Sequence, residues 1–160
     1  TRIRNKDFDA VGVFLMMGQT AQFFVQAREQ NLTLPTFGTN VFESLSEVKA
    51  ARGAMEGTVF ANNLVYEHYI RRYQAEFGQA SQLSFGAPAY EFATVLGEIV
   101  TAAPKRLTSA ELLSAFAAMP ARTGKAAGPY SFRDIPEAGR FFEFPLVMHR
   151  VHNEGFEVLP

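Results

Sequence analysis

The chain has no cysteine and no tryptophan among its 160 residues. Without cysteine there can be no disulfide, no thiolate nucleophile and no cysteine-ligated zinc site. The sequence has no run of about 18 apolar residues, so it offers no candidate transmembrane helix. The formal net charge is only -1, so no overall electrostatic attraction to nucleic acid or to an anionic membrane is expected.

What the sequence does have is the apolar content of a globular protein. Hydrophobic residues make up 48% of the chain and 16 residues are phenylalanine, which favours a folded core over disorder. A length of 160 residues is typical of one domain. Glycine-rich nucleotide loops and the H-E-x-x-H and G-x-S-x-G patterns are all absent, which argues against the common enzyme classes.

The first part of the chain alternates between strand-like and helix-like segments. Short apolar segments at 8–15, 34–38 and 57–61 predict buried strands. Between them, the spacing of apolar residues predicts helices over 19–30 and 44–51. This order is typical of an α/β fold with a parallel sheet and right-handed crossovers.

The alternation stops after the third predicted strand. Three helices are predicted in succession, over 65–77, 88–103 and 108–119. The last of them opens with Thr108 and Glu111, which form a capping box pattern. A purely alternating α/β domain therefore does not describe the whole chain.

The final part of the chain returns to strands. A β-rich segment over 140–151 is followed by the hairpin signal 153–155 and a last strand over 156–159. His149 and His152 lie three residues apart, and this odd spacing puts them on opposite faces of a strand. We therefore expect no metal site, with one histidine packed and the other at the mouth of the hairpin.

The helix predicted over 65–77 mixes aromatic and basic side chains, a mixture that can bind nucleic acid. Its aromatic and apolar residues recur at helical spacing, however, which predicts an ordinary buried stripe. The residues of that stripe are Tyr66, Tyr69, Ile70, Tyr73 and Phe77. Arg71 and Arg72 would then point towards solvent, and without net positive charge no nucleic-acid partner is expected.

Two loops follow the ends of the first two predicted strands. The first contains Met16, Met17 and Gln19, and the second contains Asn40 and Phe42. Ligands bind open α/β sheets at the carboxyl ends of the strands. The helix after the first loop would also offer free N–H groups and a positive dipole end. The alternative is that both loops are plain turns without a ligand.

Seven segments, in a fixed order along nearly the whole chain, resemble the motifs of one known family. They read DAV at 9–11, QAREQNL at 26–32, LPTFG at 34–38, EGTVFA at 56–61, YQAEFG at 73–78, AYEFA at 89–93 and GPYSF at 128–132. The chain thereby resembles the C-terminal part of a type I periplasmic solute-binding protein, of the leucine/isoleucine/valine-binding group that serves ABC importers.

The resemblance implies two α/β lobes that hold a ligand in the cleft between them. It places residues 1–62 in part of the second lobe, 63–128 in helices that complete the first lobe, and 129–160 in the hinge return and closing strands of the second. The expected fold is thus the type I periplasmic-binding-protein fold, present only as its C-terminal portion. A missing N-terminal portion, or a second chain, is expected to complete the lobes.

The resemblance also implies a function: binding a small solute in the periplasm for delivery to the membrane subunits of an ABC importer, with no cofactor, no catalytic residue and no enzymatic activity. Met16 and Asn40 match positions where the family's amino-acid binders carry an aromatic and an acidic residue. Because Asn40 is neutral, a related carboxylate or amide fits as well as an amino acid.

We expect Met16, Met17 and Phe42 to form an apolar wall for the ligand, and Gln19 and Asn40 to bind it by hydrogen bonds. The main alternative function is a ligand-sensing domain of the same fold that controls a regulator or receptor. An enzyme built on the same sheet is the third hypothesis, and it lacks an acid, base or nucleophile at these positions.

Overall fold

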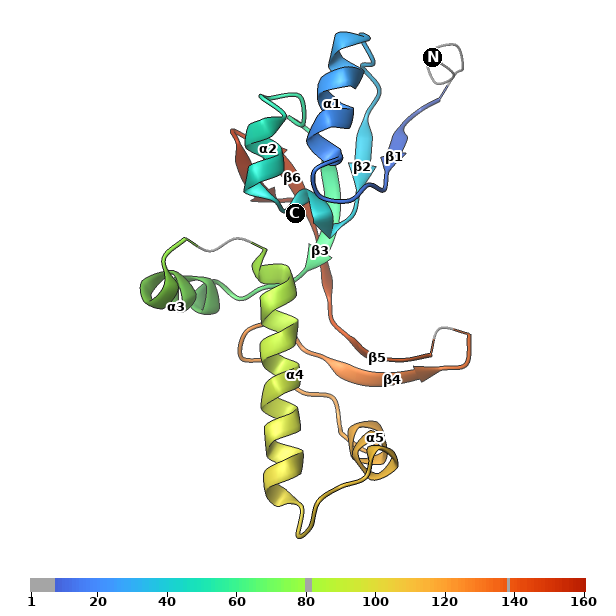
Figure 1. Cartoon of the computed structure of the whole chain (residues 1–160), viewed down its shortest axis with the longest axis vertical. Coiled ribbons are helices and arrows are strands. Elements are labelled where there is room, and N and C mark those ends of the chain that lie inside the picture. Colours follow the sequence, from blue (N-terminus) through green and yellow to red (C-terminus); the bar gives the residue numbers. More distant parts are fainter. Residues whose placement is uncertain (1–7, 80–81, 138) are drawn as a thin grey trace. The chain divides into compact units, whose positions relative to one another are not determined.

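The structure, a computed structural model, describes residues 8–79, 82–137 and 139–160 (Figure 1). The chain forms two compact units. The first combines Thr1–Asn62 with Val147–Pro160, and the second consists of Asn63–Leu146. Within the described ranges, no helix combines the length and the apolar character needed to cross a membrane.

The first unit is built on a five-stranded sheet with the strand order β1-β2-β3-β6-β7. Its elements are β1 (Val11–Val13), α1 (Thr20–Glu29), β2 (Thr36–Gly38), a 3-10 turn (Asn40–Phe42), α2 (Leu45–Ala50), β3 (Val59–Asn63), β6 (Leu146–His152) and β7 (Gly155–Val158). The β1–β2 and β2–β3 pairs are parallel and β6–β7 is antiparallel. The predicted α/β fold with a parallel sheet is confirmed.

Local sequence signals explain where several of these elements begin and end. Ser44 caps α2, its hydroxyl accepting a hydrogen bond from the Glu47 N–H. Asn153 and Glu154 both have positive φ, as the tight turn of the predicted β6–β7 hairpin requires. β1 is shorter than expected and pairs with β2 only from Thr36 onward, because Pro35 has no N–H to extend the ladder.

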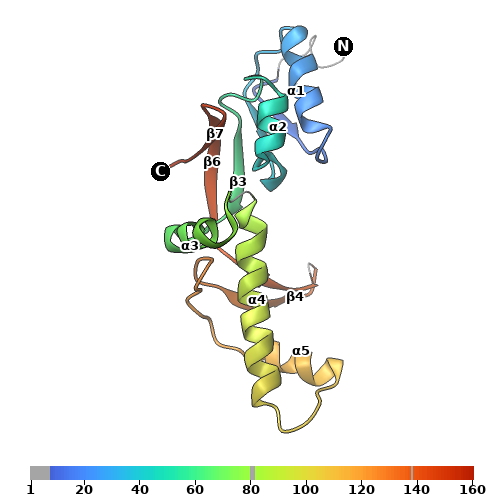
Figure 2. The same ribbon diagram turned by 60° about the vertical axis from the view of Figure 1, so that its left-hand side comes forward.

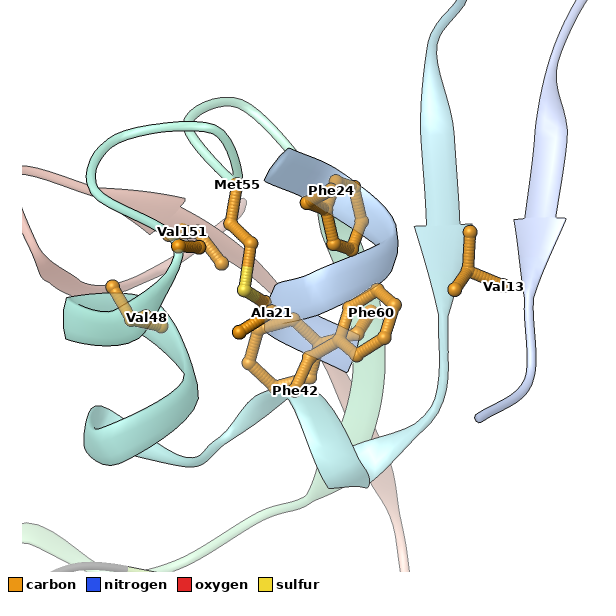
Figure 3. Close-up of a cluster of buried hydrophobic side chains, with 9 residues drawn as sticks. Val13, Ala21, Phe24, Phe42, Val48, Met55, Phe60 and Val151 are labelled. Carbon is orange, nitrogen blue, oxygen red and sulfur yellow. The ribbon is translucent and has the colours of Figure 1, made fainter. Parts of the chain in front are cut away.

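The core of the first unit lies between the sheet and helices α1 and α2, which cover the same face (Figures 1 and 2). Three phenylalanines form its centre (Figure 3). The ring of Phe42 contacts those of Phe24 and Phe60 edge to face, at centroid distances of 5.6 and 6.1 Å. Such pairs add roughly 0.5–1.5 kcal/mol each beyond the burial of apolar area.

The opposite face of this sheet carries exposed rings. Phe14 is 68% exposed and Phe37 is 44% exposed, and the two rings meet edge to face at 6.2 Å above Gly12. No described helix of this unit packs on these rings. Since large apolar side chains of a complete domain are normally covered, this face indicates a partial domain.

The second unit is formed by three helices and a two-stranded antiparallel sheet. Its elements are α3 (Glu67–Phe77), α4 (Leu83–Ala102), α5 (Ser109–Ala117), β4 (Ser131–Ile135) and β5 (Gly139–Glu143). The three successive helices are confirmed, and so is the capping box between Thr108 and Glu111 at the start of α5.

Helix α4 begins five residues earlier than the sequence indicates. The sequence predicts Pro88 as its first residue, but Pro88 lies inside the helix. A proline has no N–H, so the carbonyl of Ser84 loses its usual intrahelical donor. The side-chain amide of Asn63 donates to that carbonyl at 3.0 Å. This long-range hydrogen bond stabilises a helical turn that the local sequence disfavours.

The last segment of the chain is divided between the two units. Residues 129–146 group with the helices of the second unit, and only the chain from Val147 onward joins the first. The rings of β4 and β5 explain this, because Phe132 stacks on Phe116 of α5 at 6.0 Å and Phe142 meets the same ring at 5.5 Å. Pro145 separates β5 from β6, which were expected to be one strand.

Helix α4 exposes a row of small apolar residues on the surface of the second unit. Ala89, Ala93, Gly97 and Val100 are all exposed, whereas Leu96 is partly buried. The buried side of the helix instead contains Val95, which packs with α5 and the β4–β5 sheet. An exposed apolar helix face of this length is a second sign of a partial domain.

Candidate functional site

Both predicted ligand loops lie in the first unit, at the carboxyl ends of neighbouring parallel strands. β1 ends at Val13 and β2 at Gly38, which pair in register. Met16 and Met17 follow β1 with 70% and 54% of their surface exposed. Asn40 opens the 3-10 turn after β2. Their apolar and amide groups are therefore available at one edge of the sheet, as a ligand site requires.

The first loop is held in place by a buried carboxylate from α2. Glu47 accepts a hydrogen bond from the N–H of Gly18 through Oε1, and from the N–H of Ala21 through Oε2 at 2.7 Å. Gln19, at the cap position of α1, makes no side-chain cap bond. Glu47 thus supplies the cap from a distant helix, which neutralises the positive end of the α1 dipole.

This cap corrects one expectation. We expected the start of α1 to offer free N–H groups to a ligand, but Glu47 already binds the N–H of Ala21 in the first turn and that of Gly18 just before the helix. The sequence contains no local signal for this, because Glu47 lies 26 residues beyond Ala21. A ligand near this loop meets the exposed methionine side chains, and no open anion site at the helix terminus is indicated.

We expect Glu47→Ala to lower the free energy of unfolding of the full-length protein by about 2–3 kcal/mol, since two N–H groups lose a charged acceptor. Ligand affinity should fall as well, because the loop that carries Met16 and Met17 loses its anchor. Glu29→Ala, at the exposed end of α1, is the matched control and should change stability by less than about 0.5 kcal/mol. Equal stability of the two variants in urea unfolding would contradict the role of Glu47.

The two polar candidates differ in their surroundings. The Oε1 atom of Gln19 accepts a weak hydrogen bond from the N–H of Met16 at 3.4 Å, so part of its capacity serves the loop itself. For the Asn40 side chain, no hydrogen bond to another residue in the described ranges is found. The amide of Asn40 is therefore the better placed of the two to bind a ligand.

Phe42 does not fit its expected role as a ligand wall. Its ring is 0% exposed and packs between Phe24 and Phe60 (Figure 3). A Cβ at Gly38 would overlap this ring, so the close approach requires glycine there. The 3-10 turn rotates Phe42 inward, and Phe42 supports the second loop from within the core.

Glu43 is a polar candidate that the sequence analysis missed. It follows the same 3-10 turn as Asn40, and its Oε2 accepts a hydrogen bond from the side-chain amide of Asn62 in β3 at 2.8 Å. Burial lowers the pKa of His149, and the negative charge of Glu43 partly opposes this shift. The sequence signal that could have identified Glu43 is its position, because it is an acidic residue three positions after Asn40 in the same loop.

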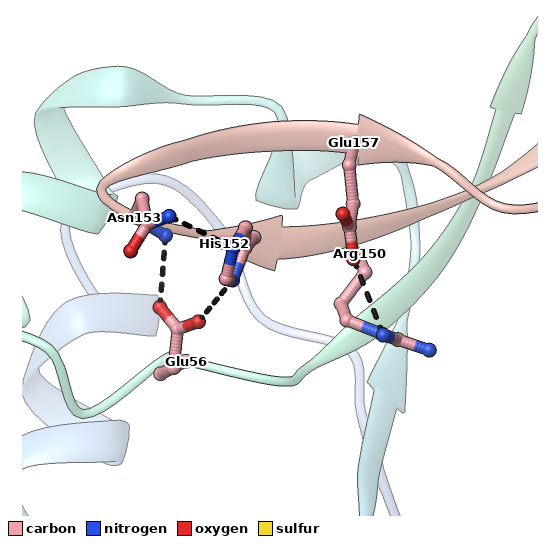
Figure 4. Close-up of polar contacts among 5 residues, drawn as sticks. All are labelled: Glu56, Arg150, His152, Asn153 and Glu157. Carbon is pink, nitrogen blue, oxygen red and sulfur yellow. Dashed lines mark hydrogen bonds and ion pairs between the residues drawn. The ribbon is translucent and has the colours of Figure 1, made fainter.

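The two histidines lie where the strand spacing predicted. His149 is packed, and its ring stacks on Phe60 at 5.3 Å. His152 lies at the mouth of the hairpin, where its Nδ1 donates to Glu56 at 2.7 Å and the N–H of Asn153 donates to the same carboxylate (Figure 4). No group of three metal-ligating side chains occurs in the described part of the chain.

Comparison with solved structures gives the fold a wider context. The chain is similar to a leucine-binding protein of Thermotoga maritima (15% identity, TM-score 0.75, 95% of this chain and 44% of that one). It is also similar to a branched-chain amino acid substrate-binding protein of Streptococcus pneumoniae in complex with isoleucine (20% identity, TM-score 0.74, 99% of this chain and 46% of that one).

A third similar structure is a solute-binding protein of an ABC transporter from R. palustris in complex with benzoate (16% identity, TM-score 0.69, 94% of this chain and 42% of that one). The chain thus spans less than half the length of each of these three proteins. All three are named as binding proteins and not as enzymes. A search of curated protein sequences finds no significant match.

A family model described as "Periplasmic binding protein" matches residues 1–154. This match covers nearly the whole chain, and it agrees with the sheet topology and with the two uncovered apolar faces. The chain belongs to the periplasmic binding protein family and carries a partial domain of its fold.

Proposed function

We propose that this chain is the C-terminal part of a periplasmic solute-binding protein that holds a small solute, either an amino acid or a related carboxylate or amide, for delivery to an ABC importer. The observation that carries the proposal is the pair of loops at the carboxyl ends of β1 and β2. The first is fixed by Glu47 and leaves Met16 and Met17 exposed. The second carries the half-buried Asn40, whose side chain makes no hydrogen bond to another described residue.

Each group has a distinct role in this proposal. The two methionines form a soft apolar wall for the hydrocarbon part of the ligand. Asn40 can donate and accept hydrogen bonds, so it binds a carboxylate or an amide and does not require an ammonium group. Glu43 places a carboxylate at this edge of the sheet, and the side-chain amide of Asn62 donates a hydrogen bond to this carboxylate.

The ligands named for similar proteins span the same chemical range. Isoleucine and benzoate are both small carboxylates with an apolar body, and only the first carries an ammonium group. A neutral amide at Asn40 is compatible with either kind of ligand. The two ligands differ because only isoleucine has an ammonium group, which can make a charge-assisted hydrogen bond to a carboxylate. Such a bond is roughly twice as strong as a hydrogen bond between neutral groups.

Two exposed apolar surfaces of this partial domain are expected to be covered by another segment of the full-length protein. The rings of Phe14 and Phe37 on the sheet and the exposed stripe on α4 are apolar, and burial would stabilise them by about 25 cal/mol per Å². An N-terminal portion of the full-length protein is the proposed cover for both faces.

The site can be tested by isothermal titration of the full-length protein with leucine, 4-methylpentanoate and leucinamide. Asn40→Ala and Met16→Ala should each weaken the best of these ligands by about tenfold, as expected for one lost hydrogen bond or apolar wall. Gln26→Ala, exposed in the middle of α1, is the control and should leave the Kd unchanged. Unchanged affinity in both site variants would refute the proposal.

A second variant tests the role of the neutral amide. Asn40→Asp restores a carboxylate at this position and should shift the preference towards leucine over 4-methylpentanoate by about tenfold, because only leucine gains a charge-assisted hydrogen bond. A preference that does not change would show that Asn40 lies away from the ligand's amino end.

A further inference from the structure

The second unit contains a cavity of about 510 Å³ at the junction of α3, α4 and the loop that precedes β4. Its lining combines aromatic rings with charged groups. The lining residues are His68, Tyr69, Arg72, Tyr73, Glu76, Phe77, Tyr90 and Lys125. A cavity of this size lies within the range of about 300–1,000 Å³ that small-molecule sites occupy.

Four of the rings that line the cavity contact one another in a continuous row. Tyr69 contacts Tyr90 at a centroid distance of 5.5 Å and Tyr73 at 6.3 Å, and Tyr73 contacts Phe77 at 4.9 Å. We expected these α3 residues to form a buried stripe, but no described residue of α3 is fully buried and Phe77 is 66% exposed. The row therefore places aromatic rings in the lining of the cavity.

Arg72, Glu76 and Lys125 at the cavity form no ion pair with another described residue. Arg71, which does not line the cavity, pairs with Glu67 at 3.8 Å. Among the ion pairs within the described ranges, by contrast, none involves Arg72, Lys125 or Glu76. Two cations against one carboxylate leave the cavity with a net positive charge.

The loop that carries Lys125 is rigidly held. Glu91, buried in α4, accepts hydrogen bonds from the N–H groups of Lys125, Ala126 and Ala127 through one carboxylate oxygen. The Nε2–H of His68 donates to the Lys125 carbonyl at 2.7 Å. These bonds tie the loop to both helices, so the cavity is pre-formed and little ordering would be needed on binding.

We propose that this cavity is a binding site for an aromatic carboxylate, distinct from the loops at β1 and β2. The ring of the ligand would stack on Tyr73 and Tyr69, and its carboxylate would pair with Arg72, whose planar guanidinium binds such a group through two parallel hydrogen bonds. Lys125, which also lines the cavity, would add a second positive charge.

Tyr69 adds a hydrogen-bond donor to the lining of the cavity. Burial raises the pKa of its hydroxyl, and the neighbouring Tyr73, Tyr90 and Glu91 raise it further. A phenol hydroxyl is protonated at neutral pH even without such a shift, so Tyr69 can donate a hydrogen bond to a carboxylate.

The test uses the full-length protein and benzoate as the probe, with cyclohexanecarboxylate and benzamide as comparison compounds. We expect one benzoate-binding component in calorimetry that Arg72→Gln weakens by about tenfold or more, and Tyr73→Leu by a similar factor. Arg71→Gln, one residue away and paired with Glu67, is the matched control. Asn40→Ala should leave this component intact, which separates it from the site in the first unit.

Three results would overturn the proposal. One is the absence of any benzoate binding at millimolar concentration. Another is a benzoate component that Asn40→Ala removes and Arg72→Gln leaves unchanged. The third is equal affinity for benzoate, cyclohexanecarboxylate and benzamide, since a site built from stacked rings and a guanidinium must distinguish an aromatic ring from a saturated one and an anion from a neutral amide.

Discussion

Glu91→Ala should lower the free energy of unfolding by roughly 3–5 kcal/mol, because three backbone N–H groups lose a charged acceptor and each unsatisfied buried donor costs about 1–3 kcal/mol. Glu91 is only 2% exposed, and Ala126 and Ala127 are fully buried beside it. Gly124 adds to the constraint, since a Cβ there would lie 2.9 Å from Glu91 Oε1. Urea unfolding of the full-length protein measures the effect.

Two further variants sharpen this prediction. Glu91→Gln keeps an acceptor oxygen and loses the charge, so its effect should be about half that of Glu91→Ala. Glu98→Gln, on the exposed side of the same helix, removes an ion pair with Arg122 and should cost less than about 1 kcal/mol. If Glu91→Ala costs no more than Glu98→Gln, the hydrogen bonds of Glu91 do not hold the loop.

Phe42→Ala should also destabilise the protein by about 3–5 kcal/mol, the usual cost of removing a buried phenylalanine ring. The ring fills the centre of the first unit's core and contacts Phe24 and Phe60. Phe77→Ala, which removes the same side chain from an exposed position, is the control and should cost below about 1 kcal/mol. Thermal or urea unfolding of both variants gives the comparison.

Phe42 also decides between a core role and a ligand role. Phe42→Leu keeps most of the buried volume and should cost roughly 1–1.5 kcal/mol, with the Kd for ligand unchanged because the ring has no exposed surface. A tenfold rise in Kd with little loss of stability would restore Phe42 as a ligand contact.

Most of the secondary structure of the first unit could be predicted from the sequence. Alternating apolar segments indicated the order of strands and helices, and Ser44 and the turn at Asn153 marked real ends of elements. These signals are local: a cap or a left-handed residue acts within about four positions of the chain. The start of α4 was predicted five residues too late, because the hydrogen-bond donor that compensates for Pro88 comes from Asn63, outside the helix.

The candidate site was predictable only in part. The position of the loops follows from parallel strands, which end at one edge of the sheet. The inward turn of Phe42 and the occupation of the α1 terminus by Glu47 do not follow from that rule. Likewise, the aromatic row on α3 has helical spacing, but the spacing alone could not show that its rings line a cavity and are not fully buried.

The sequence by itself determined the family, the α/β order and the edge of the sheet where the loops lie, because motifs and periodicities are read along the chain. Only the tertiary structure decided what Glu47 and Glu91 do. Both are buried carboxylates that bind backbone N–H groups 26–36 residues away. A buried charge requires such partners, and which backbone groups come within reach depends on how the helices pack.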